Sequence, residues 1–302
     1  METGKRALPS RIREVIIRNT FAFFAFLSVL LLGLIVLFLF REGLPLFKQV
    51  TVGQFLFGSA WYPTYSPPEY GIWPLIVGSL IVTFLSCLIA VPLGLLSAVY
   101  ISEIAPARIK EILKSVIELL AGLPSVVLGF FGMVILAPWM QETFDLPTGL
   151  NIVNASLMLA VMAIPTISSI SEDALYAVPR EFKEASYALG ATKYETIVKV
   201  AVPAAFSGIS TAVILGMARA IGETMVVLMV AGGAAAIPRG LFDPVRPMTA
   251  SIAAEMGEAP FQSGHYHALF AIGIVLFFIT LIFNLIADHV SHKFKEEGSG
   301  TL

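Results

Sequence analysis

The chain of 302 residues carries a net charge of −2 and is 57% hydrophobic but only 13% charged, whereas an average soluble domain is about 25% charged. This composition excludes an ordinary soluble domain. The sequence has no basic stripe typical of nucleic-acid binding, no G-x-x-x-x-G-K-[ST] phosphate loop and only one cysteine, Cys87. It therefore predicts no nucleic-acid partner, no ATPase site and no disulfide framework within this chain.

Six long apolar segments follow one another, and each is long enough for a bilayer-spanning helix, which needs about 20 mostly apolar residues. We predict an all-α polytopic membrane protein with spans at 20–40, 72–101, 115–137, 152–176, 204–232 and 267–290. The first apolar run is longer than the apolar core of a usual signal peptide and lacks a small-x-small site before Arg41, so we interpret it as a retained anchor. Tails are expected at 1–19 and 291–302, around a transmembrane domain at 20–290.

The distribution of Lys and Arg predicts the orientation. Segments 1–19, 103–114, 177–199 and 291–302 hold 5, 3, 4 and 2 of the 19 basic residues, and the opposite side holds only Arg41, Lys48, Arg239 and Arg246. Because cytoplasmic loops of membrane proteins carry an excess of Lys and Arg, both termini are predicted to be cytoplasmic.

The first extracytoplasmic segment, 41–71, is rich in proline and aromatic residues. Its aromatic side chains, with the tryptophan just beyond it, suit an interfacial belt, and an alternative is that part of this surface contacts an extracytoplasmic partner. These residues are Trp61, Tyr62, Tyr65, Tyr70 and Trp73.

Pro124 lies inside the third predicted span, in the stretch "AGLPSVVLGFFG". Such a proline predicts a kinked or broken helix, and membrane proteins tolerate a break only where protein or water satisfies the freed backbone groups. We therefore expect this helix to line the interior of the bundle, with Ser125 as a polar lining residue.

Charged residues near the ends of the third and fourth spans have simple local explanations. Lys114 and Glu118 are four residues apart, which predicts a local ion pair on one helix face. Glu172 and Asp173 end the fourth span, and we expect them to be solvated, with a contact to the following segment as the alternative.

The third cytoplasmic segment predicts two short helices with a sharp elbow. Pro179 suits the start of a helix, and Gly190 suits its end, where the backbone adopts a left-handed conformation. Thr192 and Glu195 have the spacing of a capping box at the start of a second helix. Pro203 marks the turn into the fifth span.

The first of these two helices is amphipathic. Phe182, Ala185 and Leu189 share one face, while Lys183 points elsewhere. Spacing alone leaves two possibilities open: the hairpin lies on the inner leaflet, or it is presented to a soluble partner.

The fifth span carries an arginine and a glutamate close to mid-membrane. Arg219 and Glu223 are four residues apart, so a continuous helix would place them on one face as an ion pair. They border a stripe of small residues that favours close helix packing, formed by Gly208, Ala212, Gly216 and Ala220. One interpretation is a structural ion pair that fixes the packing. The other is functional, because ionisable residues inside a membrane are costly.

His265 and His267 lie in the last extracytoplasmic stretch, two residues apart, which puts them on different faces of a helix. No metal site is predicted from them or from any other group of residues.

The cytoplasmic hairpin resembles the EAA loop of ABC-importer permeases, whose pattern is E-A-A, three residues, G, nine residues and I-x-L-P. In "EASYALGATKYETIVKVAVP", Glu184, Ala185, Gly190 and Pro203 match, whereas Ser186 replaces the second alanine. The resemblance implies the type I (MetI-like) fold, and a coupling loop at 178–203 that docks on a cytoplasmic ATPase subunit. The residues assigned to this loop by the resemblance are Phe182, Glu184, Ala185, Ser186, Leu189, Gly190, Ala191 and Pro203.

Further stretches, including "IELLAGLPSVVLGFFGMVIL", "ARAIGETMVVLMVAGG" and "PVRPMTASIAAEMGEA", resemble the C-type permease subunits of phosphate-specific transport systems, the PstC family. This resemblance implies import of inorganic phosphate, with Arg219 and Glu223 on the substrate path, which the broken third span with Ser125 is also expected to line. It also implies a second, A-type permease, two ATPase subunits that bind ATP and Mg, and an extracytoplasmic phosphate-binding protein. No cofactor is expected on this chain itself.

Two other functions remain open at this stage. One is a permease for another oxyanion, such as sulfate or molybdate. The other is a secondary transporter or channel that works alone, although such a protein has no use for an ATPase-docking hairpin. A membrane enzyme lacks a supporting set of catalytic residues.

Overall fold

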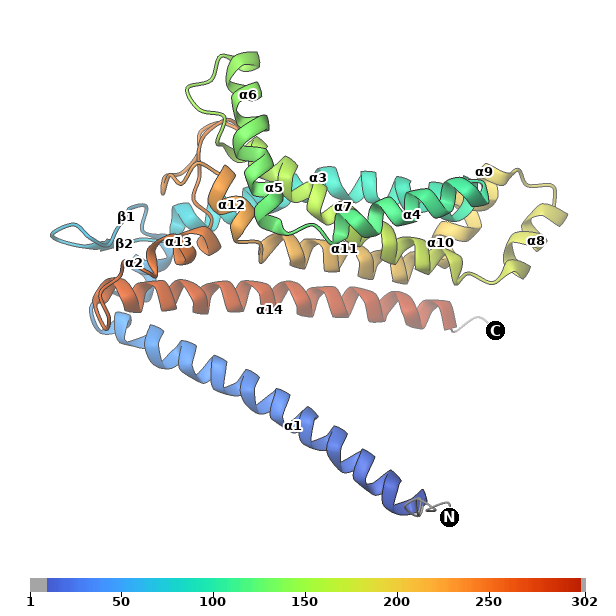
Figure 1. Ribbon diagram of the computed structural model, residues 1–302, viewed down its shortest axis with the longest axis horizontal. Coiled ribbons are helices and arrows are strands. Elements are labelled where there is room, and N and C mark those ends of the chain that lie inside the picture. The colour runs from blue at the N-terminus through green and yellow to red at the C-terminus, as the bar shows by residue number, and fades with distance from the viewer. Residues whose placement is uncertain (1–9, 300–302) are drawn as a thin grey trace, which may run out of the picture.

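The computed structural model describes residues 10–299, and side chains within 14–286. The chain is almost entirely helical (Figure 1). The long helices and the segments packed among them are α1 (Ser10–Gly43), α3 (Trp73–Val99) with its π-helical extension η2 (Tyr100–Ile104), α4 (Ala107–Ala121), α5 (Ser125–Phe131), η3 (Gly132–Leu136), α6 (Ala137–Phe144), α7 (Ile152–Tyr176), α11 (Phe206–Ile221), α12 (Met225–Val230) and α14 (Gly264–Ser299).

Shorter elements cap the two ends of this bundle. One end carries η1 (Leu44–Lys48), α2 (Val52–Phe57), α13 (Met248–Glu255) and a two-residue antiparallel pair of β1 (Trp61–Tyr62) and β2 (Glu69–Tyr70). The other carries α8 (Arg180–Ala188), α9 (Lys193–Thr196), η4 (Ile197–Ala201) and α10 (Val202–Ala204).

The number of candidate spans is five or six, by length and composition, which agrees with the predicted all-α polytopic fold. Five helical segments of the described chain are long and apolar enough to cross a membrane, and a bent pair, Lys193–Ala204 with Phe206–Ile221, supplies a sixth. Figure 1 shows that the N-terminal end of α1 and the C-terminal end of α14 lie at the same end of the bundle as α8 and α9. This arrangement agrees with the orientation predicted from the basic residues.

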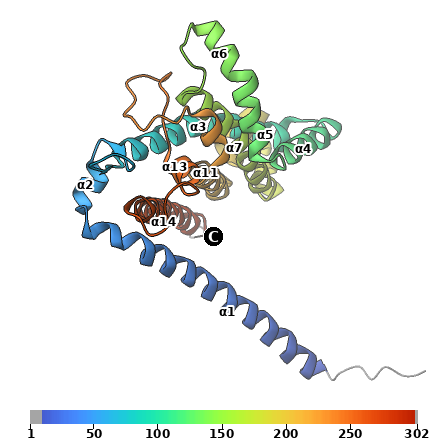
Figure 2. The ribbon, with the colours of Figure 1, turned by 60° about the vertical axis from the view of Figure 1, so that its left-hand side comes forward.

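The helices at the two ends of the chain extend into the predicted tails. The helix α1 begins at Ser10 and α14 continues to Ser299, so residues 10–19 and 291–299 of these tails are helical. Residues 1–9 and 300–302 of those tails lie outside the described residues. Figures 1 and 2 show α1 diverging from the rest of the bundle, which it contacts mainly near its end, through Phe38 on Phe270 and Phe40 on Phe278.

The third span differs from the predicted 115–137. The helix α4 ends at Ala121, and the chain breaks at 122–124 before α5 begins at Ser125. The apolar candidate span is therefore Ser125–Phe144, and in Figure 1 it stands across the direction of α7 while α4 runs beside α7. The predicted break at Pro124 is confirmed, but its consequence is larger than a kink because Pro124 cannot continue a helix hydrogen-bond ladder.

Small residues bring α3, α7 and α11 close together. A Cβ added at Gly216 of α11 would lie 2.5 Å from the Ile167 side chain, and one added at Gly94 of α3 would lie 2.8 Å from the same side chain. A Cβ at Gly208 would collide with Ala174. The predicted small-residue stripe of α11 therefore faces α7, and Ile167 fills the space between three helices.

The aromatic residues of the extracytoplasmic segment do not form a simple interfacial belt. Trp61 and Tyr70 are 2% and 7% exposed and belong to the apolar core of the extracytoplasmic cap. Tyr62 and Tyr65 are exposed and stack on each other at 4.9 Å. The segment folds on itself, which a count of aromatic residues does not reveal.

Candidate functional site

Arg219 lies in the last turn of α11, half-buried between α11 and α7. Its Nη1 donates a hydrogen bond to Thr166 Oγ1 of α7 at 3.2 Å. Thr166 follows Pro165, which stands inside the helix α7. The close approach of the two helices at Gly216 brings the guanidinium to this hydroxyl, because Gly216 lies one turn before Arg219.

The predicted ion pair between Arg219 and Glu223 is not found in the described structure. The helix α11 ends at Ile221, and Gly222 begins a break of three residues before α12. Four-residue spacing brings two side chains together only while the helix continues. Glu223 turns away instead, and its Oε1 accepts hydrogen bonds from the backbone N–H groups of Met225 at 3.1 Å and Val226 at 3.3 Å.

The break that carries Glu223 is held from another helix. Thr249 Oγ1 of α13 donates to the Glu223 carbonyl oxygen at 2.7 Å. The segment at 222–224 thus connects the mid-span arginine to the extracytoplasmic cap.

The other predicted path residue, Ser125, is the first residue of α5 and is half-buried. No hydrogen bond links it to Arg219 in the described chain, so its place on the path stays a prediction. Thr166 was not predicted, although its position in the apolar stretch "VMAIPTISSI" is a signal that a search for isolated polar residues would detect.

The cytoplasmic hairpin has the predicted construction. Gly190 adopts a φ of +85° after α8. The capping box is present, with Glu195 N donating to Thr192 Oγ1 at 3.3 Å and Thr192 N donating to Glu195 Oε2 at 2.9 Å. A bend of 71° separates Lys193–Ala204 from α11, directly after Pro203.

One face of the hairpin is apolar and open to solvent. Leu189 is 90% exposed and Phe182 is 49% exposed, and Ala185 and Glu184 lie beside them on the surface. The other face points inward. Ser186 and Thr196 share a hydrogen bond of 2.9 Å between the two arms, and Ala191 N donates to the Ser186 carbonyl at 3.2 Å.

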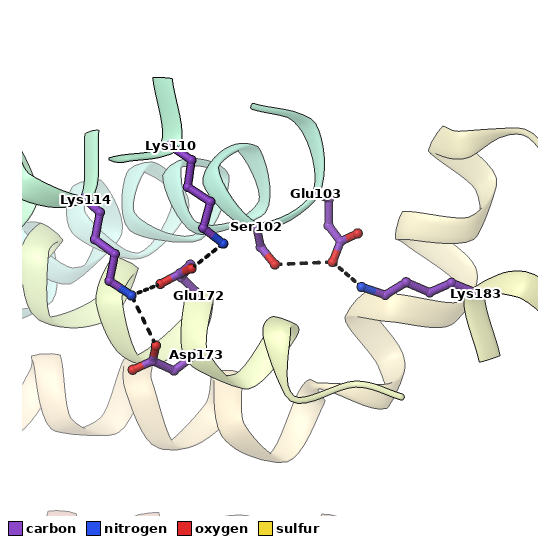
Figure 3. A network of polar contacts seen from close by, with 7 residues as sticks. All are labelled: Ser102, Glu103, Lys110, Lys114, Glu172, Asp173 and Lys183. Carbon is purple, nitrogen blue, oxygen red and sulfur yellow. Dashed lines mark hydrogen bonds and ion pairs between the residues drawn. The ribbon is translucent and has the colours of Figure 1, made fainter. Parts of the chain in front are cut away.

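Figure 3 shows the ion pairs that attach this region to its neighbours. Lys183 Nζ of α8 lies 2.6 Å from Glu103 Oε1 of η2. Lys110 and Lys114 of α4 contact the two oxygens of Glu172 at 2.9 Å and 2.8 Å, and Lys114 also lies 3.6 Å from Asp173. The hydrogen bond to Glu172 raises the pKa of Lys114 above its ordinary value.

Two predictions about these charges were wrong. Lys114 pairs with Glu172 of α7 rather than with Glu118, its neighbour on the same helix. Glu172 is 4% exposed rather than solvated, because α4 lies alongside the end of α7 and covers it. Asp173 points outward, as expected, with a side chain that is 68% exposed.

A second polar group gathers in the extracytoplasmic cap around Glu255, the last residue of α13. Its carboxylate accepts from Trp61 Nε1 at 3.0 Å, pairs with Arg246 at 2.6 Å and contacts His265 Nε2 at 2.8 Å. These four residues line a cavity of about 630 Å³. His265 is therefore part of a carboxylate-centred network, and no group of residues suited to a metal ion occurs in the described chain.

A bundle of long apolar helices, with an exposed two-helix hairpin at one end, defines a multi-pass membrane protein. Residues 90–296 match the family model described as "Binding-protein-dependent transport system inner membrane component". The chain belongs to this family of ABC-transporter permeases, which are multi-pass proteins of the inner membrane.

Relatives and solved structures agree with this family. The chain is 43% identical to the probable ABC transporter permease protein YqgH of Bacillus subtilis, over 86% of this chain and 85% of the relative. It is 34% identical to the phosphate transport system permease protein PstC of Pasteurella multocida, over 91% and 90% of the two chains. A bacterial ABC transporter involved in the import of alginate has the same fold, with a TM-score of 0.64, 17% identity and coverage of 94% and 99%.

Proposed function

We propose that this chain is the permease subunit of an ATP-driven importer of inorganic phosphate. It would form half of the translocation path with a second, A-type permease. Several relatives that are 31–34% identical over most of the chain are named phosphate transport permeases, which supports phosphate as the substrate.

The observation that carries the proposal is the position of Arg219. Its guanidinium lies at the junction of α7 and α11, hydrogen-bonded to the neutral hydroxyl of Thr166, while the Glu223 carboxylate is engaged by backbone N–H groups. A guanidinium offers a planar set of donors that matches two oxygens of an oxyanion. Glu223 on the adjacent break would limit how tightly the anion is held, so that phosphate is released after each cycle.

Coupling to ATP would occur through the hairpin. We propose that two cytoplasmic ATPase subunits bind ATP and Mg and receive the exposed face of Phe182, Ala185 and Leu189, one on each permease. Closure of the ATPase pair would displace the hairpins and reopen the helices toward the opposite side of the membrane. An extracytoplasmic phosphate-binding protein would deliver the substrate and supply most of the selectivity.

The alternatives differ in substrate or in energy source. Sulfate or molybdate presents a similar tetrahedral set of oxygens to Arg219, so the arginine alone does not discriminate among them. A transporter or channel that works alone is disfavoured by the hairpin, because an exposed leucine at the tip of a capped helical elbow suits a protein partner.

The test is reconstitution of the complete complex in proteoliposomes. Inorganic phosphate presented with its binding protein should stimulate ATP hydrolysis and enter the vesicles. Stimulation by sulfate or molybdate with no response to phosphate would reject the substrate. ATP-independent phosphate movement by the isolated chain would reject the class of transporter.

A further inference from the structure

The coupling hairpin is joined to α3 by an ion pair that lies away from solvent. Lys183 Nζ and Glu103 Oε1 are 2.6 Å apart, and their side chains are 19% and 10% exposed. Ser102 Oγ donates a further hydrogen bond to the same Glu103 oxygen at 3.3 Å. Figure 3 shows Lys183 of α8 extending toward Glu103 of η2, at the end of α3.

Apolar packing supports the same junction. Ala98 near the end of α3, Leu175 and Val178 at the end of α7, and Ala201 and Ala205 at the foot of the hairpin form one buried cluster. The Lys183–Glu103 ion pair therefore adds to an apolar contact between α3 and the hairpin. A displacement of the hairpin acts on α3 at this point.

The two arms of the hairpin are joined internally. The Ser186–Thr196 hydrogen bond links the arms, and the capping box of Thr192 and Glu195 fixes the start of the second arm. Lys183 is fixed on this unit, facing away from the exposed face of Phe182 and Leu189. A protein partner bound to the exposed face would therefore move Lys183, which is paired with Glu103 at the end of α3.

The far end of α3 is attached to the extracytoplasmic cap. Met248 N donates to Ser79 Oγ at 2.8 Å, and a Cβ added at Gly78 would lie 3.3 Å from Val245. Val245 lies in the link between α12 and α13, where it forms a β-bridge with Gly232, and Met248 is the first residue of α13. The helical segment Trp73–Ile104, formed by α3 and η2, therefore connects the hairpin with the segment that follows the break at Glu223.

We propose that Glu103 and Lys183 are positioning residues for energy coupling, and that they transmit displacement of the hairpin to α3 and through it to the extracytoplasmic end of the path. The inference rests on the proposed function, because it requires an ATPase docked on the hairpin. A partner charge removed from such a buried pair leaves the other charge without compensation, which weakens the contact far more than loss of an exposed pair does.

The test compares four variants of this chain in the complete complex, with phosphate uptake and ATP hydrolysis measured on the same vesicles. Glu103→Gln and Lys183→Gln remove one charge each. The exchanged pair Glu103→Lys with Lys183→Glu restores the attraction in reverse. Lys199→Gln is the control, because Lys199 lies on the same hairpin and forms only an exposed pair with Glu195 at 3.7 Å.

We expect each single variant to retain ATP hydrolysis while phosphate imported per ATP falls about tenfold, the size of change given by a coupling free energy in the usual range for paired side chains. The exchanged pair should recover most of this ratio, and Lys199→Gln should match the unmodified protein. Uptake per ATP unchanged in the single variants would overturn the proposal, as would a loss that the exchanged pair does not recover. If the unmodified complex shows no ATPase stimulation by phosphate, sulfate or molybdate, the proposed function fails instead.

Discussion

Arg219 of α11 and Thr166 of α7 share a hydrogen bond of 3.2 Å between Nη1 and Oγ1 in the middle of the membrane-crossing bundle. The hydroxyl accepts from the guanidinium, so its own proton is left to donate to an oxygen of a passing anion. On the proposed path, two donors from two helices would face one anion. Arg219 thus has a neutral hydrogen-bond partner where an ion pair with Glu223 was expected.

We predict that Thr166→Val reduces phosphate uptake about tenfold or more, whereas Thr166→Ser keeps most of it. Valine has nearly the same shape as threonine but lacks the hydroxyl, and loss of one hydrogen bond to a charged group costs about 1.5–3 kcal/mol. The measurement is the initial rate of phosphate uptake at equal amounts of complex. Equal rates for the valine and serine variants would remove Thr166 from the path.

The Arg219–Glu223 relationship shows where sequence reasoning reaches its limit. The spacing "RAIGE" predicts an ion pair if the helix continues, but Gly222 permits a break, and the Glu223 carboxylate is then captured by two N–H groups that the break exposes. Thr249 of α13 adds a hydrogen bond to the Glu223 carbonyl oxygen within the break. That contact is remote in sequence and leaves no local pattern.

The hairpin could be predicted from the sequence because its contacts are local. Gly190, Thr192 and Glu195 interact with residues within a few positions along the chain, so a glycine and a capping box determine the local backbone. Glu255 and its three partners come from four separate segments, and the burial of Glu172 depends on α4 lying alongside α7. The sequence patterns of these segments show burial but not which segments meet.

Gly190 provides a test of the hairpin geometry. Its φ of +85° is unfavourable for L-residues, and a Cβ there would meet no atom within 4 Å, so backbone strain is the main cost of a substitution. Gly190→Ala should destabilise the elbow by about 1–2 kcal/mol and weaken binding of the purified ATPase subunit. Gly190→Asn should do so less, because asparagine tolerates the left-handed region better. Indistinguishable binding by the alanine variant and the unmodified protein would contradict this.

The exposed leucine of the hairpin gives a direct test of docking. Leu189 is 90% exposed, so Leu189→Glu should leave the fold intact. If an ATPase subunit covers this side chain, the variant should bind it at least about tenfold more weakly, because burying an unpaired carboxylate costs several kcal/mol. Leu241→Glu is the matched control, an exposed leucine at 55% in the extracytoplasmic cap. Equal affinity of both variants for the ATPase would place the docking surface elsewhere.

The contact between α7 and α11 should be sensitive to one methyl group. A Cβ at Gly216 would lie 2.5 Å from Ile167, whereas a Cβ at Gly33 of α1 would meet nothing within 4 Å. Gly216→Ala should therefore lower stability by about 1–3 kcal/mol through overpacking, and Gly33→Ala should not. Thermal unfolding of the two variants in detergent gives the comparison. A midpoint for Gly216→Ala equal to that of the unmodified protein would mean that Ile167 moves aside freely.

Glu172 and Asp173 are neighbours whose substitution should have unequal effects. Glu172 is held between Lys110 and Lys114 with a side chain only 5% exposed, whereas Asp173 is 68% exposed and 3.6 Å from Lys114. Glu172→Gln leaves two lysine ammonium groups facing each other without their carboxylate. Both lysines still reach solvent in part, at 28% and 41%, so we expect a loss of about 1–3 kcal/mol, less than for a fully buried pair. Asp173→Asn should cost under about 1 kcal/mol, as exposed pairs do. Denaturant or thermal unfolding would separate the two, and equal losses would show that α4 is held to α7 by its apolar contacts instead.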